Sequence, residues 1–336
     1  MDQFRRILVR AANWVGDAVM SVPALQALRA HNPQARISIL ARPWVAGLYG
    51  REAFCDELIP YDVPRGWHGL NEKRRVGADL RARKFDCALL LQNAFEAAAL
   101  VRWAGIPFRI GYDRDARGWL LTHPIPLPAA GDIPRHQRFY YLELLKRARL
   151  IPGYEMDSVI RLSGERHAGR TVGVSPGAAY GGAKRWLPER FAEAAIELAR
   201  ERGAQVAVFG SKEEVEICER VCQAVAAAGV ACRNFAGTTP LGEFIEMAAA
   251  CELFLTNDSG AMHVASALGV PTVVVFGATD EEATGPTGAG SRVVRHPVEC
   301  SPCLLRECPI DHRCMTRVTA SDVVEAARGL VGIERK

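Results

Sequence analysis

The sequence predicts an α/β protein of two tandem, Rossmann-like domains that face a cleft. A length of 336 residues favours two domains over one. In both halves, short aliphatic or β-branched runs alternate with helical segments, a pattern typical of βαβ units and a parallel sheet. Ile151-Pro152-Gly153 and a polar stretch to about residue 169 interrupt the alternation. We therefore expect one domain at residues 1–155 and a second at 156–336.

Each element is predicted from its local pattern. In the first half, aliphatic runs indicate strands at 6–11, 37–40, 85–91 and 108–111, and helices are expected at about 18–30, 71–83, 95–103 and 135–147. In the second half, strands are expected at 171–175, 205–209, 253–256 and 272–276. Helices are expected there at 188–202, 213–228, 241–250, 261–268 and 320–330, the first opened by a proline. Packing of the final helix on the first domain is an alternative to packing within the second.

The composition is that of a globular protein. With 49% hydrophobic and 24% charged residues, it excludes disorder, collagen and coiled coil. Asn13 and Asp17 interrupt the first apolar stretch before a signal-peptide core can form, so we expect a cytoplasmic protein. No apolar run approaches the roughly 20 residues that span a bilayer. Any contact with a membrane is therefore expected to be peripheral.

Charge is divided unevenly along the chain. Residues 1–150 carry 23 Lys and Arg against 14 Asp and Glu, whereas residues 151–336 carry 19 against 24. The basic half suggests an anionic ligand or an acidic lipid surface, and an ordinary charged face is the simpler alternative. Nucleic acid is disfavoured, because Lys73-Arg74-Arg75 and the basic residues at 81–84 fall on one predicted solvated helix with no aromatic stacking motif.

The first candidate loop, Asn13-Trp14-Val15-Gly16-Asp17, follows the first strand. Its single glycine is not the three-glycine dinucleotide fingerprint, which disfavours a hydride-transferring enzyme. A carboxylate at the carboxyl end of a strand can accept a proton from a substrate hydroxyl. Asp17 can equally be a helix cap or a first-turn carboxylate that the helix dipole favours.

The second candidate loop, Ser175 to Trp186, joins the first strand of the second half to its helix. Three glycines permit close backbone approach, and Lys184 with Arg185 supplies positive charge, so a phosphate fits there. No Ser or Thr follows the lysine, so this is not a Walker loop. A flexible surface turn is the alternative.

The third candidate loop, Thr256 to His263, is a strand end that runs into a helix of small residues. Free backbone N–H groups at such a helix start form an anion site, which Gly260 leaves open to a diphosphate. Asp258 or Ser259 is expected to cap the helix if either acts alone. The strand ends at 209–213 and 237–241 are weaker candidates for ribose and base contacts.

Three motifs together resemble the lipopolysaccharide heptosyltransferases of glycosyltransferase family 9. They are Trp14-Val15-Gly16-Asp17 with 21–25 (SVPAL), Pro176-Gly177 with 184–191 (KRWLPERF), and 257–260 (NDSG) with His263, 267–271 (ALGVP) and Phe276-Gly277. The motifs occur in the family's order, and the resemblance extends from about residue 6 to residue 330.

This resemblance implies a GT-B fold, with the acceptor on the N-terminal domain and the nucleotide sugar on the C-terminal domain. The implied donor is ADP-L-glycero-β-D-manno-heptose, and the implied acceptor is the anionic heptosyl-Kdo-lipid A core. The enzyme is then expected to be peripheral on the inner face of the inner membrane. The anionic acceptor agrees with the basic first half of the chain.

The resemblance also implies roles for individual residues. Asp17 is the expected general base and Lys184 the cation that stabilises the leaving ADP. The expected donor-binding residues, besides Lys184, are Ser175, Gly181, Glu213, Thr239, Leu241, Asp258, Ser259, Gly260, Met262 and His263. The expected acceptor-binding residues are Asn13, Trp14 and Gly16.

Neither a cofactor nor a catalytic metal is expected. Asp113-Arg114-Asp115 matches the D-x-D pattern of metal-dependent glycosyltransferases, but it lies among arginines in the first half and is better interpreted as a solvated turn. Cys300, Cys303, Cys308 and Cys314 are crowded and are either free thiols or ligands of a structural zinc. The other cysteines are expected to be buried free thiols: Cys55, Cys87, Cys218, Cys222, Cys232 and Cys251.

Two alternatives to a heptosyltransferase stay open at this stage. One is a family relative that transfers another nucleotide-activated sugar to a different glycan. The other is a non-catalytic protein that binds a nucleotide sugar or a glycan, which the presence of both Asp17 and Lys184 disfavours.

Overall fold

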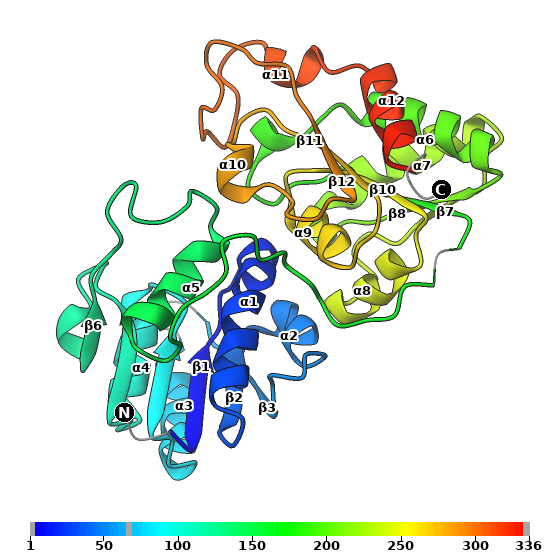
Figure 1. The fold of residues 1–336 in the computed structure, drawn as a ribbon. Coiled ribbons are helices and arrows are strands. Elements are labelled where there is room, and N and C mark those ends of the chain that lie inside the picture. Colours follow the sequence, from blue (N-terminus) through cyan, green and yellow to red (C-terminus); the bar gives the residue numbers. More distant parts are fainter. Residues whose placement is uncertain (1–3, 65–68, 168, 332–336) are drawn as a thin grey trace. The chain divides into compact units, whose positions relative to one another are not determined.

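The computed structural model describes residues 4–64, 69–167 and 169–331 (Figure 1). The chain divides into two compact units, Met1–Ser158 and Val159–Lys336. The division falls three residues beyond the predicted boundary at 155. Among the described residues, no helix combines the length and the apolar character needed to cross a membrane.

Unit 1 contains a six-stranded parallel sheet in the order β3-β2-β1-β4-β5-β6. Its strands are β1 (Arg6–Arg10), β2 (Arg36–Ala41), β3 (Glu57–Pro60), β4 (Cys87–Leu90), β5 (Phe108–Tyr112) and β6 (His123–Ile125). Its helices are α1 (Val15–His31), α2 (Pro43–Tyr49), α3 (Leu70–Ala82), α4 (Phe95–Trp103), the short 3₁₀ helix η2 (Gly118–Leu120) and α5 (Arg138–Arg147). The central strands β1 and β4 are aliphatic and almost wholly buried, as expected where helices cover both faces of a parallel sheet.

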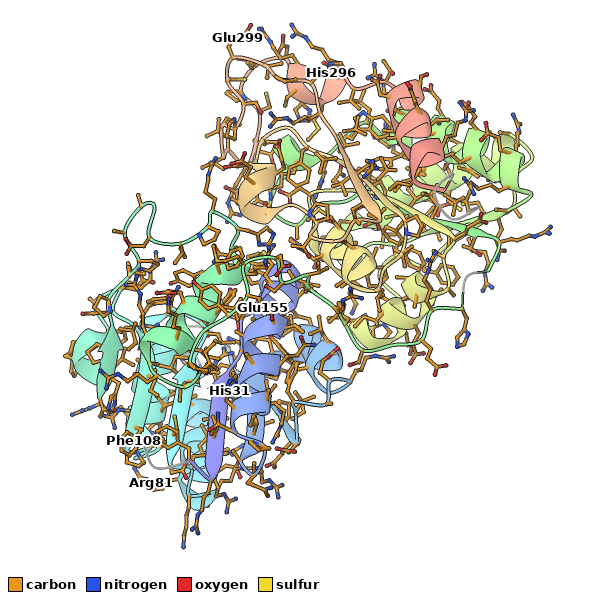
Figure 2. All side chains as sticks on the ribbon, viewed as in Figure 1. His31, Arg81, Phe108, Glu155, His296 and Glu299 are labelled. Carbon is orange, nitrogen blue, oxygen red and sulfur yellow. The ribbon has the colours of Figure 1, made fainter. Side chains whose placement is uncertain are left out.

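The helices of unit 1 form two groups. Helix α1 packs against α2 and α5, whereas α3 packs against α4. Because the strands are parallel, every βα loop emerges at the carboxyl edge of the sheet and every αβ loop at the amino edge. Phe108, which begins β5, and Arg81, near the end of α3, mark the amino edge (Figure 2).

Unit 2 repeats this plan with the order β12-β11-β10-β7-β8-β9, again all parallel. Its strands are β7 (Thr171–Ser175), β8 (Gln205–Val208), β9 (Cys232–Asn234), β10 (Leu253–Asn257), β11 (Thr272–Val275) and β12 (Ser291–Val294). Its helices are η3 (Gly182–Lys184), α6 (Pro188–Arg202), η4 (Lys212–Glu214), α7 (Val215–Ala227), α8 (Leu241–Ala249), α9 (Gly260–Ala267), α10 (Glu281–Thr284), α11 (Arg313–Thr316) and α12 (Ala320–Val331). The final helix, α12, packs on α6, β11 and β12, within its own unit.

The order of the strands reverses once in each sheet, between β1 and β4 in unit 1 and between β7 and β10 in unit 2. In doubly wound sheets, ligands bind outside the carboxyl ends of the strands at this switch point. The three loops singled out in the sequence follow β1, β7 and β10. All three therefore lie at a switch point.

Candidate active site

Asn257 fixes the loop that follows β7. Its side chain is fully buried at the end of β10. Its Oδ1 accepts a hydrogen bond from the backbone N–H of Trp186 at 2.9 Å, and its Nδ2 donates to the carbonyl oxygen of Pro176 at 2.7 Å. Both ends of the loop are thus held by one side chain. These contacts restrain the loop at both ends and disfavour the alternative of a flexible turn.

Lys184, in this loop, forms an ion pair with Asp258 of the loop after β10. Its Nζ lies 2.5 Å from Asp258 Oδ2, and the two side chains are only 12% and 5% exposed. The same carboxylate oxygen accepts a hydrogen bond from the Thr279 hydroxyl at 2.5 Å. The ammonium also lies over the ring of Tyr180, 4.8 Å from its centroid. An ammonium has three N–H donors, so donors besides the one on Asp258 can serve a ligand.

Helix α9 begins directly after Asp258 and Ser259. In the described part of the chain, the side chain of the N-cap residue Ser259 caps none of the first-turn amides. The Ser259 hydroxyl instead lies 3.2 Å from that of Thr256, and the Asp258 carboxylate is held by Lys184. The expectation that Asp258 or Ser259 caps this helix is therefore wrong. The amides and the positive end of the helix dipole remain available to an anion.

A segment from far along the chain covers the glycines of the Lys184 loop. The backbone N–H of Ala183 donates to the carbonyl oxygen of Arg306 at 2.9 Å, and that of Gly182 donates to Glu307 Oε1 at 3.0 Å. The Tyr180 hydroxyl donates to the carbonyl oxygen of Leu304 at 2.7 Å. Residues 304–307 thus hold the middle of the loop, between the two ends that Asn257 binds. This contact cannot be predicted from the sequence, because no spacing rule links segments more than 120 residues apart.

Gly181 is the point where this contact leaves no room for a side chain. It has φ +157°, a backbone conformation that L residues rarely adopt, and a Cβ built on it would lie 2.2 Å from the carbonyl oxygen of Arg306. We expect Gly181→Ala to lower the free energy of unfolding by about 1–3 kcal/mol and to weaken ADP binding, because the loop must shift. Thermal unfolding and calorimetric titration with ADP measure the two effects.

Gly290→Ala is the matched control, because a Cβ on Gly290 meets nothing within 4 Å. It should leave both quantities at their parental values. Parental stability and parental ADP affinity in Gly181→Ala would show that residues 304–307 do not restrain the loop.

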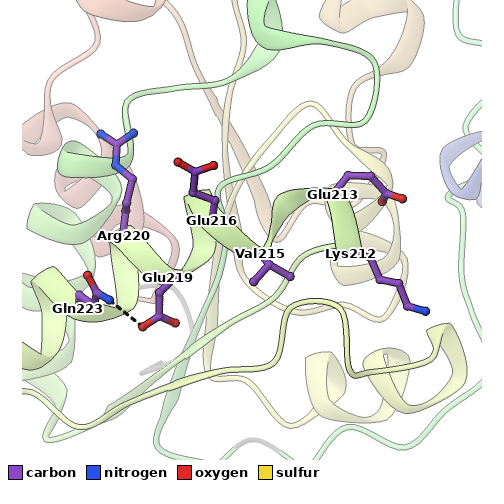
Figure 3. Close-up of a pocket in the computed structure, with 7 residues that line it drawn as sticks. All are labelled: Lys212, Glu213, Val215, Glu216, Glu219, Arg220 and Gln223. Atoms are coloured by element: carbon purple, nitrogen blue, oxygen red, sulfur yellow. Dashed lines mark hydrogen bonds between the residues drawn. The ribbon is translucent and has the colours of Figure 1, made fainter.

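Glu213, expected at the ribose, lies in η4 at one end of a shallow groove along α7 (Figure 3). The groove is lined by Lys212, Glu213, Val215, Glu216, Glu219, Arg220 and Gln223. Its three carboxylates against two cations make it unsuitable for a diphosphate, although a carboxylate can accept hydrogen bonds from ribose hydroxyls. A hydrogen bond from its own backbone N–H, then one from the Ser211 hydroxyl, lower the pKa of Glu213. The neighbouring Glu214 is instead buried against Gly177 and completes a capping box with Ser211.

The remaining expected donor contacts occupy different environments. Ser175 is buried at the end of β7, and Thr239 and Leu241 are half-buried at the start of α8. Met262 is fully buried beside Val274 and Phe276, so its side chain belongs to the core and only its first-turn amide can serve a ligand. His263 is buried in the same helix.

In unit 1, α1 begins at Val15, so Asp17 is a first-turn carboxylate and Trp14 the N-cap residue. Asp17 is half-buried, and its Oδ1 accepts a hydrogen bond from the Tyr141 hydroxyl of α5 at 3.3 Å. Burial, and then the charge of Asp17, raise the pKa of Tyr141 well above its usual value. The tyrosine therefore stays protonated and keeps donating to the carboxylate.

The loop that carries Asn13, Trp14 and Gly16 is held by a buried arginine. Arg10 is 2% exposed, and it donates to the carbonyl oxygen of Ala11 at 2.9 Å and to Asn13 Oδ1 at 3.2 Å. Burial lowers the pKa of Arg10 to about 10, so the guanidinium stays charged at neutral pH. The Oδ1 of Asn13 is thus occupied within the protein.

Two segments of the chain are candidates for metal binding. Asp113-Arg114-Asp115 lies in a turn of unit 1, where Arg114 pairs with Asp115 at 3.5 Å. Burial raises the pKa of Cys314, and the nearby thiols of Cys300, Cys308 and Cys303 raise it further. Nevertheless, among the residues that the structure describes, no three His, Cys, Asp or Glu side chains are grouped to hold a metal ion. The cysteines are free thiols in this structure, and zinc stays a prediction of their spacing.

Comparison with known proteins gives the same family as the sequence motifs. The family described as glycosyltransferase family 9 (heptosyltransferase) matches residues 73–313. Lipopolysaccharide heptosyltransferase 2 of Salmonella typhimurium is 34% identical over 313 residues, which cover 86% of this chain and 88% of that protein. The protein of the same name from Escherichia coli matches with the same identity and coverage.

The fold agrees as well. The solved structure of Escherichia coli ADP-heptose LPS heptosyltransferase II has a TM-score of 0.82 and 31% identity, and the match covers 98% of this chain and 100% of that one. The predicted family, its heptosyltransferase II branch and the GT-B fold class are thereby confirmed. The chain belongs to glycosyltransferase family 9, the heptosyltransferases.

Proposed function

We propose that this protein transfers heptose from ADP-L-glycero-D-manno-heptose to the heptosyl-Kdo-lipid A inner core of lipopolysaccharide, with inversion at the anomeric carbon. The observation that carries the proposal is the placement of Lys184 and the uncapped start of α9 at the switch point of unit 2. The relatives named above support the choice of sugar and acceptor.

The donor diphosphate would bind between Lys184 and the first-turn amides of α9. The ion pair with Asp258 holds the lysine ammonium in place, and its other N–H donors would serve the phosphate oxygens. We assign Asp258 to positioning Lys184, because a carboxylate in contact with a diphosphate would repel it. As the bond between the anomeric carbon and the phosphate breaks, these groups stabilise the charge that develops on ADP.

Asp17 would act on the acceptor. Its carboxylate takes the proton from the attacking hydroxyl as that oxygen bonds to the anomeric carbon, and ADP leaves from the opposite face. One displacement on one face inverts the anomeric configuration. The Tyr141 hydroxyl bound to Oδ1 orients the carboxylate.

The acceptor is a glycolipid that carries carboxylates and phosphates. The excess of Lys and Arg in residues 1–150 suits such an acceptor and an acidic lipid surface. We therefore place the enzyme in the cytoplasm, peripheral on the inner face of the inner membrane. No nucleic acid partner is proposed.

The test is transfer by the purified protein. ADP-heptose is incubated with heptosyl-Kdo-lipid A, and we expect ADP release, a product heavier by one heptose and an inverted anomeric centre. Acceptor that lacks the first heptose, and other nucleotide sugars, should react poorly. Preference for another sugar would favour the alternative of a different transferase, and ADP binding without transfer would favour a non-catalytic binding protein.

We propose that the reaction needs no metal, because Lys184 and α9 supply positive charge where other enzymes use a divalent ion. Activity in millimolar EDTA should stay within about twofold of the untreated rate after correction for ionic strength. Added Mg²⁺ or Mn²⁺ should then change little. Loss of activity in EDTA that Mg²⁺ restores would contradict metal independence.

A further inference from the structure

Two tryptophans lie exposed on neighbouring loops at the carboxyl edge of unit 1. Trp14 is 55% exposed and Trp44 is 52% exposed. Trp14 follows β1, and Trp44 is in the first turn of α2, which follows β2, the strand next to β1. A scattered exposed hydrophobic residue is ordinary, but two large indoles beside a candidate catalytic loop indicate a binding surface.

The ring of Trp44 is held in place although half of it is exposed. Its Nε1 donates to the carbonyl oxygen of Asn13 at 2.7 Å. The guanidinium of Arg42 lies 5.6 Å from the ring centroid. Arg42 is itself buried and donates to the carbonyl oxygens of Tyr61 and Val63, so it is a fixed support. The indole is thus ordered in advance of any ligand.

The hydrogen bond from Trp44 Nε1 to the carbonyl oxygen of Asn13 connects Trp44 to the loop that contains Asp17. Asn13 directly precedes Trp14, and the carbonyl oxygen of Trp14 accepts the N–H of Ala18 at 2.8 Å in the first turn that contains Asp17. A ligand that rests on these rings would therefore lie beside the carboxylate. Flat, fixed indole faces suit the C–H faces of pyranose rings, and the indoles add no charge that would select an anion.

We infer that Trp44, together with Trp14, forms a stacking subsite for a pyranose ring of the acceptor glycan. The inference rests on the proposed function, and it names the part of the acceptor that unit 1 recognises. The subsite holds a neutral sugar so that its hydroxyl reaches Asp17. Trp44 acts in binding and positioning, and it takes no part in proton transfer.

The experiment compares tryptophan variants with the parent enzyme. Trp44→Leu removes the aromatic face but keeps apolar bulk, and it should raise KM for heptosyl-Kdo-lipid A about tenfold, a usual size for an aromatic contact. The kcat should stay within about twofold, and ADP affinity, measured by calorimetry, should not change. Trp44→Phe restores an aromatic face and should recover most of the acceptor affinity.

Trp103→Leu is the matched control. Trp103 is 42% exposed at the end of α4, and Arg81, at the amino edge in Figure 2, donates to its carbonyl oxygen. It therefore lies at the opposite edge of the sheet from Asp17, and its replacement should leave KM at the parental value. If Trp44→Leu also lowers the melting temperature, Trp14→Leu provides the same test from the other ring.

A binding measurement separates this inference from the proposed function. Deacylated heptosyl-Kdo oligosaccharide is titrated into the protein by calorimetry, which needs no transfer step and no tryptophan signal. Binding by the parent and at least tenfold weaker binding by Trp44→Leu would support the subsite, even for a protein that transfers no heptose. An unchanged KM and unchanged oligosaccharide binding in Trp44→Leu would overturn it, although heptose transfer would stand. Absence of oligosaccharide binding by the parent would overturn it as well.

Discussion

Asp17→Asn should reduce kcat by roughly 10²–10⁴-fold, the usual contribution of a general base. Asparagine has the same shape and its Oδ1 can still accept the Tyr141 hydroxyl, so the local structure should persist. What it loses is the ability to take a proton from the acceptor. ADP affinity should be parental, because the proposed ADP site lies wholly in unit 2. Rates at saturating donor and acceptor, together with calorimetric titration with ADP, measure both quantities.

Glu72→Gln controls for the simpler role of a first-turn carboxylate. Glu72 is exposed in the first turn of α3, so its loss removes a favourable interaction with a helix dipole and little else. It should cost about 0.3–1 kcal/mol of stability and leave kcat unchanged. A kcat for Asp17→Asn within threefold of the parent value would show that Asp17 is only a first-turn carboxylate and not the general base.

The predicted and the missed strands differ in their place in the sheet. All eight inner strands were predicted, because most of them are the nearly continuous aliphatic runs that helices on both faces of a parallel sheet require. The four missed strands are the four edge strands: β3 (ELIP), β6 (HPI), β9 (CRN) and β12 (SRVV). They are three or four residues long, partly exposed and partly polar, so their local pattern resembles that of a loop.

In the candidate site, too, some features could be predicted from the sequence and others could not. The loops after β1, β7 and β10 could be predicted, because glycine, lysine and carboxylate residues directly follow recognisable strands. The contacts that shape those loops could not. Thr279 bonds to Asp258 across 21 positions, and Arg306 contacts Ala183 across more than 120. Such contacts depend on which strands are neighbours, and a single sequence does not specify them.

Two adjacent glutamates also differ in burial, and the sequence alone does not predict which of them is buried. Glu213 and Glu214 are chemically identical and adjacent, yet the first is exposed on the α7 groove and the second is buried against Gly177. The turn of η4 decides which carboxylate faces inward. Trp44 was missed for a related reason, because it belongs to a short helix that had not been predicted and lies beside Asn13 only once β1 and β2 pair.

Lys184→Met should lower kcat/KM for the donor by roughly 10²–10³-fold, the cost of removing one strong electrostatic contact from a developing anion. The same change should lower the free energy of unfolding by about 3 kcal/mol, because it leaves the buried carboxylate of Asp258 without its cation. Steady-state kinetics and thermal unfolding measure the two losses. A single variant cannot say which loss causes the other.

The double variant Lys184→Met with Asp258→Asn separates them. A neutral amide at position 258 can still bond to Thr279 and needs no cation, so stability should return toward that of the parent. Activity should stay as low as in Lys184→Met, because the diphosphate still lacks its ammonium. Asp258→Asn alone should keep the ammonium of Lys184 but remove the ion pair that restrains it. Its kcat/KM for the donor should therefore lie between those of the parent and of Lys184→Met. Recovery of activity together with stability in the double variant would show that Lys184 holds the loop and does not act on the leaving group.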